Sequence, residues 1–245
     1  MSSVLTSSTL GRSAMASVVL ALIVTFTPAV YAQQNPGAAP SGDAKTGAEP
    51  VYKPPLRGAP GGRVGGGTRG TGREAFVLSV LAPSHTGLTT SEQPVLFWFI
   101  SAPTSNPVEL TVVDPQKTDP LLELRLDPPV AAGFHRVRLS DHGVRLAPGV
   151  SYQWWVAVVA DTGRRSKDVL AGGSIELVSP PDGLAAKLSR ASKADMPSLY
   201  AAAGLWYDAV AVLGELIDQA PTDRNLLEQR SALLRQVGLP ETKAQ

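Results

Sequence analysis

The stretch from Leu146 to Ala160, LAPGVSYQWWVAVVA, constrains the fold of this chain more than any other. Its Pro-Gly pair indicates a corner, because proline fixes its own φ and glycine accepts conformations that other residues avoid. An apolar run rich in aromatic and β-branched residues follows, which is typical of a buried strand. Tyr152 stands three residues after Gly149, near the start of that run. The stretch therefore predicts a corner that leads into a central β-strand.

Similar short runs recur between residues 75 and 179, separated by turn-forming residues such as Asp114-Pro115 and Thr162-Gly163. Seven strands in about 100 residues, with regular turns between them, are the signature of a β-sandwich. The predicted strands are Phe76–Leu81, Val95–Ile100, Val108–Val113, Leu121–Leu126, Phe134–Leu139, Tyr152–Val159 and Gly173–Val178.

The aromatic residues of this region resemble those of immunoglobulin-like and bacterial fibronectin type III-like domains. Tyr152 stands where such domains have a tyrosine corner, whose hydroxyl we expect to bond a backbone acceptor of the preceding turn. Trp154 is expected on the same face, and Trp98 occupies the place of the buried strand-C tryptophan. The resemblance implies an antiparallel sandwich. Such domains are mostly adhesive or spacer modules, but the fold does not define a function.

Residues 180–240 have helical spacing instead. Leu184, Leu188 and Ala191 form one short apolar stripe. Three longer helices are predicted: one capped by Asp195 and ended by Gly204, one from Trp206 to Pro221, and one capped by Thr222 or Asp223 and ended by Gly238.

Two segments of this helical region, LYAAAGL at Leu199 and LLRQVGL at Leu233, repeat at an offset of 34 residues. This is the tetratricopeptide period, and the region resembles such a repeat. A plain helical hairpin explains the pattern equally well, because fewer than two units are present. We expect the helices to dock on the sandwich through Trp155 and Trp206, leaving the Tyr207-Asp208 edge free for a partner.

Residues 1–32 have the pattern of a signal peptide. The apolar core runs from Ser17 to Phe26, and Val30-Tyr31-Ala32 fits a cleavage site. An uncleaved anchor is the alternative, but the run is short of the ~20 residues of a membrane span. We expect export to the periplasm or beyond, with a mature chain that starts at Gln33 and has no transmembrane segment.

Residues 33–74 are rich in Gly, Pro and Arg and are predicted to be a disordered arm. Gly65, Gly67 and Gly70 match a GxGxxG spacing, but the strand and helix of a dinucleotide site are not predicted around them. Binding to RNA does not suit an exported protein. The arm is expected to make at most weak contact with an anionic surface, through Arg57, Arg63, Arg69 and Arg73.

The sequence predicts no catalytic, cofactor-binding or metal-binding residue. The chain has no cysteine and a formal charge of +1, which gives no reason to expect disulfides, thiolate chemistry or nucleic-acid binding. His85, His135 and His142 have no recognised metal spacing and are interpreted as solvated loop residues. Trp155 could stack on a carbohydrate, but packing under the C-terminal helices is the favoured interpretation.

End to end, the chain resembles the domain of unknown function 928 family. The shared features are Arg57 to Gly70, Pro94 to Phe99, Tyr152-Gln153-Trp154 and Gly204 to Ala209. This resemblance implies no activity, cofactor or site, although it makes Arg57 to Gly70 look less like an indifferent linker.

We therefore expect an α+β protein: a disordered arm, an immunoglobulin/fibronectin-like antiparallel β-sandwich and a small C-terminal helical unit. The expected function is that of a non-enzymatic binding or assembly component of the bacterial cell envelope, with another envelope protein as its partner. The alternative is a carbohydrate-binding protein, or an enzyme whose site assembles only in three dimensions.

Overall fold

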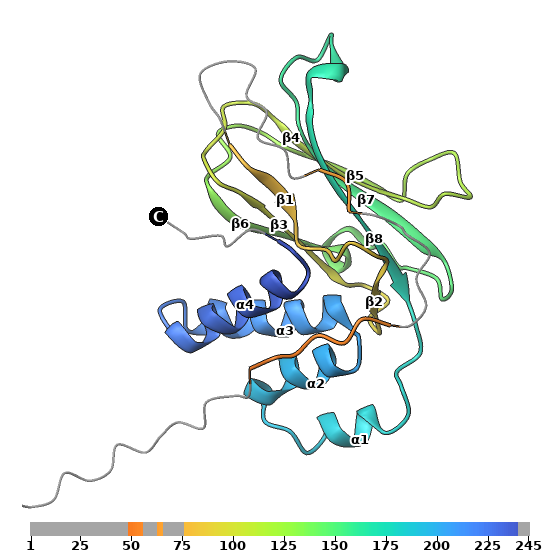
Figure 1. The fold of residues 1–245 in the computed structure, drawn as a ribbon. Coiled ribbons are helices and arrows are strands. Elements are labelled where there is room, and N and C mark those ends of the chain that lie inside the picture. Colours follow the sequence, from red (N-terminus) through yellow and green to blue (C-terminus); the bar gives the residue numbers. More distant parts are fainter. Residues whose placement is uncertain (1–48, 56–62, 66–75, 240–245) are drawn as a thin grey trace, which may run out of the picture. The chain divides into compact units, whose positions relative to one another are not determined.

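Two β-sheets followed by four α-helices make up the fold, which is therefore α+β (Figure 1). The computed structural model describes residues 49–55, 63–65 and 76–239. The predicted signal peptide, its cleavage site and most of the predicted arm lie outside these residues. The strands in the described part are β1 (Leu78–Val80), β2 (Gly87–Thr89), β3 (Val95–Ile100), β4 (Val108–Val113), β5 (Leu122–Leu126), β6 (Gly133–Arg138), β7 (Ser151–Val158) and β8 (Val169–Leu177).

One sheet has the strand order β1-β3-β6 and the other β2-β8-β7-β4-β5. All neighbours are antiparallel except β2 and β8, which pair in parallel. The seven predicted strands are confirmed. The eighth, β2, is only three residues long (Gly-Leu-Thr) and is too short to show a period in the sequence.

The two sheets share one hydrophobic core. Leu96, Trp98 and Ile100 alternate along β3 and are fully buried, as are the alternating valines and leucine of β4. The sheets approach closely at Gly173 of β8, where an added Cβ would lie 2.5 Å from the Cβ of Ala82. The glycine is needed there because any side chain would collide with the opposite layer.

The predicted bond between Tyr152 and its corner is confirmed, with one correction. Tyr152 is buried, and its hydroxyl oxygen accepts a 2.9 Å hydrogen bond from the backbone N–H of Ala147. The partner is thus a backbone donor and not the expected acceptor. The strand-C position expected for Trp98 is wrong, because strand C shares a sheet with the tyrosine-corner strand and Trp98 lies in the other sheet.

The α-helices are α1 (Leu184–Leu188), α2 (Met196–Ala202), α3 (Trp206–Gln219) and α4 (Arg224–Gln236). Gly204 follows α2 with φ at 79°, which suits glycine best. Asp223 caps α4 by accepting bonds from the N–H groups of Asn225 and Leu226, as predicted. Asp195 is the N-cap residue of α2, as predicted, but its side chain makes no capping bond, because its carboxylate accepts from the hydroxyl of Ser192.

The helices lie along one side of the three-stranded sheet, with α3 against β2 and β3 (Figure 1). Phe97 alternates with the core residues of β3 and meets Gly214 in the middle of α3. The three-stranded sheet is therefore covered by the five-stranded sheet on one face and by helices on the other.

Two short parts of the predicted disordered arm are ordered in the structure. In residues 49–55, the N–H of Lys53 donates to the carbonyl of Ala201 and the N–H of Tyr52 to the side chain of Gln236. Val64 pairs with Gly172 of β8 as an isolated bridge. Tyr52 is buried by this docking, whereas Val64 remains about half exposed at 52%.

Candidate functional site

Three consecutive residues at the start of α3 attach the helices to the sheets. The indole N–H of Trp206 donates to the carbonyl of Leu81, just after β1, at 2.8 Å. The Trp206 side chain is fully buried. A buried indole N–H is usually hydrogen-bonded, and this bond attaches the start of α3 to the chain just after β1.

Tyr207 bridges two strands of the five-stranded sheet. Its hydroxyl accepts a 2.9 Å bond from the indole N–H of Trp154 and donates a 3.0 Å bond to the carbonyl of Ser174. The ring fits against Gly87 of β2, where an added Cβ would lie 2.6 Å from the Tyr207 ring. Burial raises the pKa of Tyr207, so the hydroxyl stays protonated and can donate.

Asp208 completes the attachment. Its carboxylate accepts bonds from the backbone N–H of Thr90 at 3.0 Å and from the Thr90 hydroxyl at 2.8 Å. Burial raises the pKa of Asp208, and these hydrogen bonds oppose that rise. The expectation that the Tyr207-Asp208 edge is free for a partner is therefore wrong, because both side chains are used to dock the helices.

The expected contact of Trp155 with the helices is replaced by one from its neighbour Trp154. Side chains alternate along β7, so only one of the two tryptophans can face the helices. Trp154 points to Tyr207, whereas Trp155 covers Gly172, where an added Cβ would lie 2.3 Å from the indole. Trp155 is half-buried against its own sheet.

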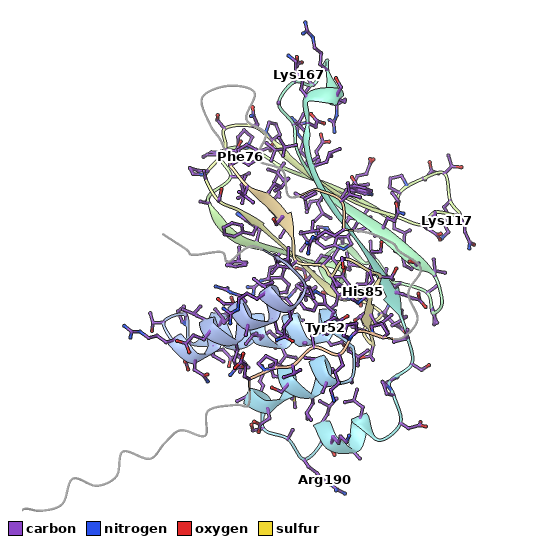
Figure 2. The ribbon with its side chains drawn as sticks, viewed as in Figure 1. Tyr52, Phe76, His85, Lys117, Lys167 and Arg190 are labelled. Carbon is purple, nitrogen blue, oxygen red and sulfur yellow. The ribbon has the colours of Figure 1, made fainter. Side chains whose placement is uncertain are left out.

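His85 belongs to a small aromatic cluster near the junction of helices and sheets, where Figure 2 places it close to Tyr52. Its Nε2 lies 2.8 Å from the Tyr52 hydroxyl, and the Tyr52 ring meets Trp206 edge-on at 5.0 Å. Burial lowers the pKa of His85 and raises that of Tyr52. The interpretation of His85 as a solvated residue is wrong.

The other two histidines differ from each other. His135 lies in β6, stacked on Trp98 at 4.2 Å, with Nε2 2.8 Å from the carbonyl of Ala131. Thus it is not a loop residue, contrary to expectation. His142 is exposed in the 3-10 turn Leu139–His142. No group of three or more His, Cys, Asp or Glu in the described chain is arranged to hold a metal.

Arg63 is the one predicted arm arginine inside the described residues. Its Nη1 donates to the carbonyls of Ala82 and Val237, and its Nη2 donates to the carbonyl of Gly238 at 3.0 Å. Arg63 thus satisfies carbonyls at the end of α4, which a helix leaves unpaired. This use differs from the expected weak contact with an anionic surface.

A cavity of about 310 Å³ lies where α3 and α4 cross the outer face of β3 and β6. We call it the Arg230 pocket. Eight of its lining residues carry apolar side chains and three carry charges, and the exposed wall is divided almost evenly between apolar and polar surface. The lining residues are Leu81, Phe97, Phe134, His135, Arg136, Val210, Leu213, Gly214, Ile217, Asp218, Arg230, Leu233 and Leu234.

Of the three charged residues in the Arg230 pocket, two pair with each other and the third does not. Arg136 forms an ion pair with Asp218, across from β6 to α3. Arg230 lies over the ring of Phe134, with its Cζ 3.7 Å from the ring centroid. Within the described residues, Arg230 has no carboxylate partner at salt-bridge distance, and burial lowers its pKa. An arginine stays charged even so, and the described lining residues leave this positive charge without an ion pair.

Sequence reasoning did not identify the Arg230 pocket. Its residues come from two strands and two helices that are far apart in the chain, and each is ordinary in its own segment. The one local signal is Gly214, a glycine in the middle of a helix, which often has a packing reason.

These features define an α+β protein in which two packed sheets carry a helical cover, with a pocket between cover and sheet. The chain belongs to the family described as Domain of Unknown Function (DUF928), which matches residues 64–245. The match begins inside the Arg57 to Gly70 stretch. No curated protein and no solved structure matches the chain significantly. Among the described residues, no helix is long and apolar enough to cross a membrane.

Proposed function

We propose that this protein is a non-enzymatic binding or assembly component of the bacterial cell envelope. The observation that carries the proposal is the Arg230 pocket, a cavity with eight apolar side chains in its lining and one arginine that has no carboxylate partner in the described chain. Pockets of this kind, apolar with a few placed polar groups, are typical of binding sites.

The chemistry of the lining favours binding over catalysis. Its residues include neither Ser, Thr, Lys nor Tyr, and the two that could act as nucleophiles, Asp218 and His135, already have partners. Asp218 is paired with Arg136, and His135 is stacked on Trp98. The alternative of carbohydrate binding by Trp155 has less support, since its indole packs on Gly172.

We also propose that the two sheets form an immunoglobulin/fibronectin-like sandwich. If β7 is strand F, then β8, β7 and β4 stand in the order G-F-C, and β1, β3 and β6 stand as A, B and E in the other sheet. The Tyr152 bond to Ala147 supports this assignment. The tetratricopeptide-like nature of the helices stays a prediction.

Export remains part of the proposal, with cleavage after Ala32 and a periplasmic or extracellular mature chain. N-terminal sequencing of the protein from an envelope fraction tests it. A sequence that starts at Gln33 supports export, and an intact Met1 chain in the membrane contradicts it.

Affinity capture of the mature protein from its native envelope tests the binding function. Three baits are compared: wild type, Arg230→Gln in the pocket, and Arg224→Gln, an exposed arginine at the start of the same helix. The proposal expects a partner, another envelope protein, that wild type and Arg224→Gln retain and Arg230→Gln loses. Equal capture by all three baits would contradict the role of the pocket.

A further inference from the structure

We infer that the Arg230 pocket binds a small amphipathic molecule with an apolar body and a single carboxylate, which pairs with Arg230. This inference rests on the proposed binding function and names the ligand class of its site.

The size and walls of the pocket fit the apolar body of such a ligand. A volume of about 310 Å³ is at the lower end of the range for small-molecule sites. Val210, Leu213 and Ile217 line it from α3, and Phe97 and Phe134 from the strands. Gly214 adds no side chain to the space above Phe97. These apolar side chains can bury the hydrocarbon of a ligand, and the polar part of the wall is left for its head group.

The position of Arg230 selects the head group. The Phe134 ring covers one face of the guanidinium and holds it in place, and a stacked guanidinium keeps its N–H edge for hydrogen bonds. A carboxylate matches two of those N–H groups at once. A cationic ligand would be repelled, and an uncharged one would leave the Arg230 charge unpaired in an apolar wall.

The pairing of the other charges sets the ligand charge at minus one. Among the described lining residues, Arg136 and Asp218 neutralise each other, which leaves the charge of Arg230 to be compensated. A dianion would bring one charge more than Arg230 can pair, and a partly buried charge without a partner is costly. The site is therefore matched to a monocarboxylate.

Competition against a fluorescent probe tests this. The probe is 8-anilinonaphthalene-1-sulfonate, which has an aromatic body and one negative charge and fluoresces in apolar sites. Decanoate and 1-decanol, of equal chain length, are the competitors. Decanoate is expected to displace the probe at a concentration at least about tenfold lower than decanol, as a charge-assisted hydrogen bond implies.

Variants of the mature protein test whether the preference for decanoate depends on Arg230. Arg230→Gln is expected to lower the affinity for decanoate at least about tenfold and to leave the affinity for decanol unchanged. Arg224→Gln is expected to change neither affinity. Arg230→Lys keeps the charge but loses the planar fork, so decanoate should bind with intermediate strength. Circular dichroism confirms that each variant is folded.

Three results would overturn the inference: decanoate and decanol compete equally well, neither competes, or the Arg230→Gln variant behaves like wild type. These results are separable from the proposed function. If decanoate does not displace the probe while envelope capture still depends on Arg230, the pocket holds a protein segment, and only the ligand class is wrong. If decanoate binds through Arg230 and no partner is captured, the assembly role is wrong and the inference stands.

Discussion

The indole N–H of Trp154 in β7 donates a 2.9 Å hydrogen bond to the hydroxyl of Tyr207 in α3. Both side chains are buried, and the same hydroxyl donates onward to the carbonyl of Ser174 in β8. One oxygen atom thus ties a helix to two neighbouring strands. Since Trp206 and Asp208 bond the sheets on either side of Tyr207, we expect helices and sheets to unfold in a single transition.

Tyr207→Phe is expected to destabilise the protein by about 2 kcal/mol, because the buried Trp154 N–H loses its acceptor. Urea unfolding measures the change. Tyr200→Phe is the matched control, since Tyr200 lies on the adjacent helix, is half-buried and has no hydroxyl bond in the described structure. It should cost less than about 0.5 kcal/mol. Equal losses in the two variants would show that the bridge contributes nothing.

Tyr152→Phe is expected to cost about 1–3 kcal/mol, because the N–H of Ala147 loses its partner at the corner. Denaturant unfolding with an unchanged slope would show a pure loss of stability. A cost below about 0.5 kcal/mol would mean that water replaces the hydroxyl at no penalty, and that the bond does not hold the corner.

Gly173→Ala is expected to destabilise by about 1–3 kcal/mol through overpacking, because the new methyl group would meet the Cβ of Ala82 between the sheets. Gly163→Ala is the control. Gly163 is exposed in a turn, and its nearest neighbour to an added Cβ is at 3.4 Å. Thermal unfolding of both variants tests this, and an unchanged midpoint for Gly173→Ala would contradict the close approach of the sheets.

The stability of the protein is expected to fall in mild acid because of His85. Burial holds the folded-state pKa of His85 below its ordinary 6.5, so the unfolded chain binds the proton first. The contribution of neutral His85 to the free energy of unfolding is complete above about pH 6.5 and is lost as the pH falls towards the lowered pKa.

His85→Gln isolates this effect, since glutamine keeps a polar group near the Tyr52 hydroxyl but does not titrate. The free energy of unfolding of wild type minus that of the variant, measured by urea from pH 8 to pH 5, should decrease on acidification. A difference that grows in acid would mean that the fold favours protonated His85.

Much of the secondary structure could be predicted from the sequence, because its causes act over a few residues. Asp223 caps α4 through N–H groups two and three residues away, and Gly204 ends α2 through its own φ. The Tyr152 corner is equally local, with its partner five residues back. The three-residue β2 lacked such a signal, since its pairing with β8 comes from distant residues.

The candidate site and the contacts that dock the helices depend on the tertiary structure. The short polar-aromatic motif predicts an exposed Tyr207-Asp208 edge, yet Tyr207 bonds Trp154 in β7 and Asp208 bonds Thr90 just after β2. The Arg230 pocket exists only because α3 and α4 cross β3 and β6, bringing Arg230 over Phe134. Sequence determined most of the strands and helices and several of their ends, since capping and turn chemistry are short-ranged. Only the tertiary structure decided that Tyr207 and Asp208 form buried hydrogen bonds and that Arg230 lines a cavity without an ion pair in the described chain. The reason is that burial and charge pairing depend on residues from separate parts of the chain.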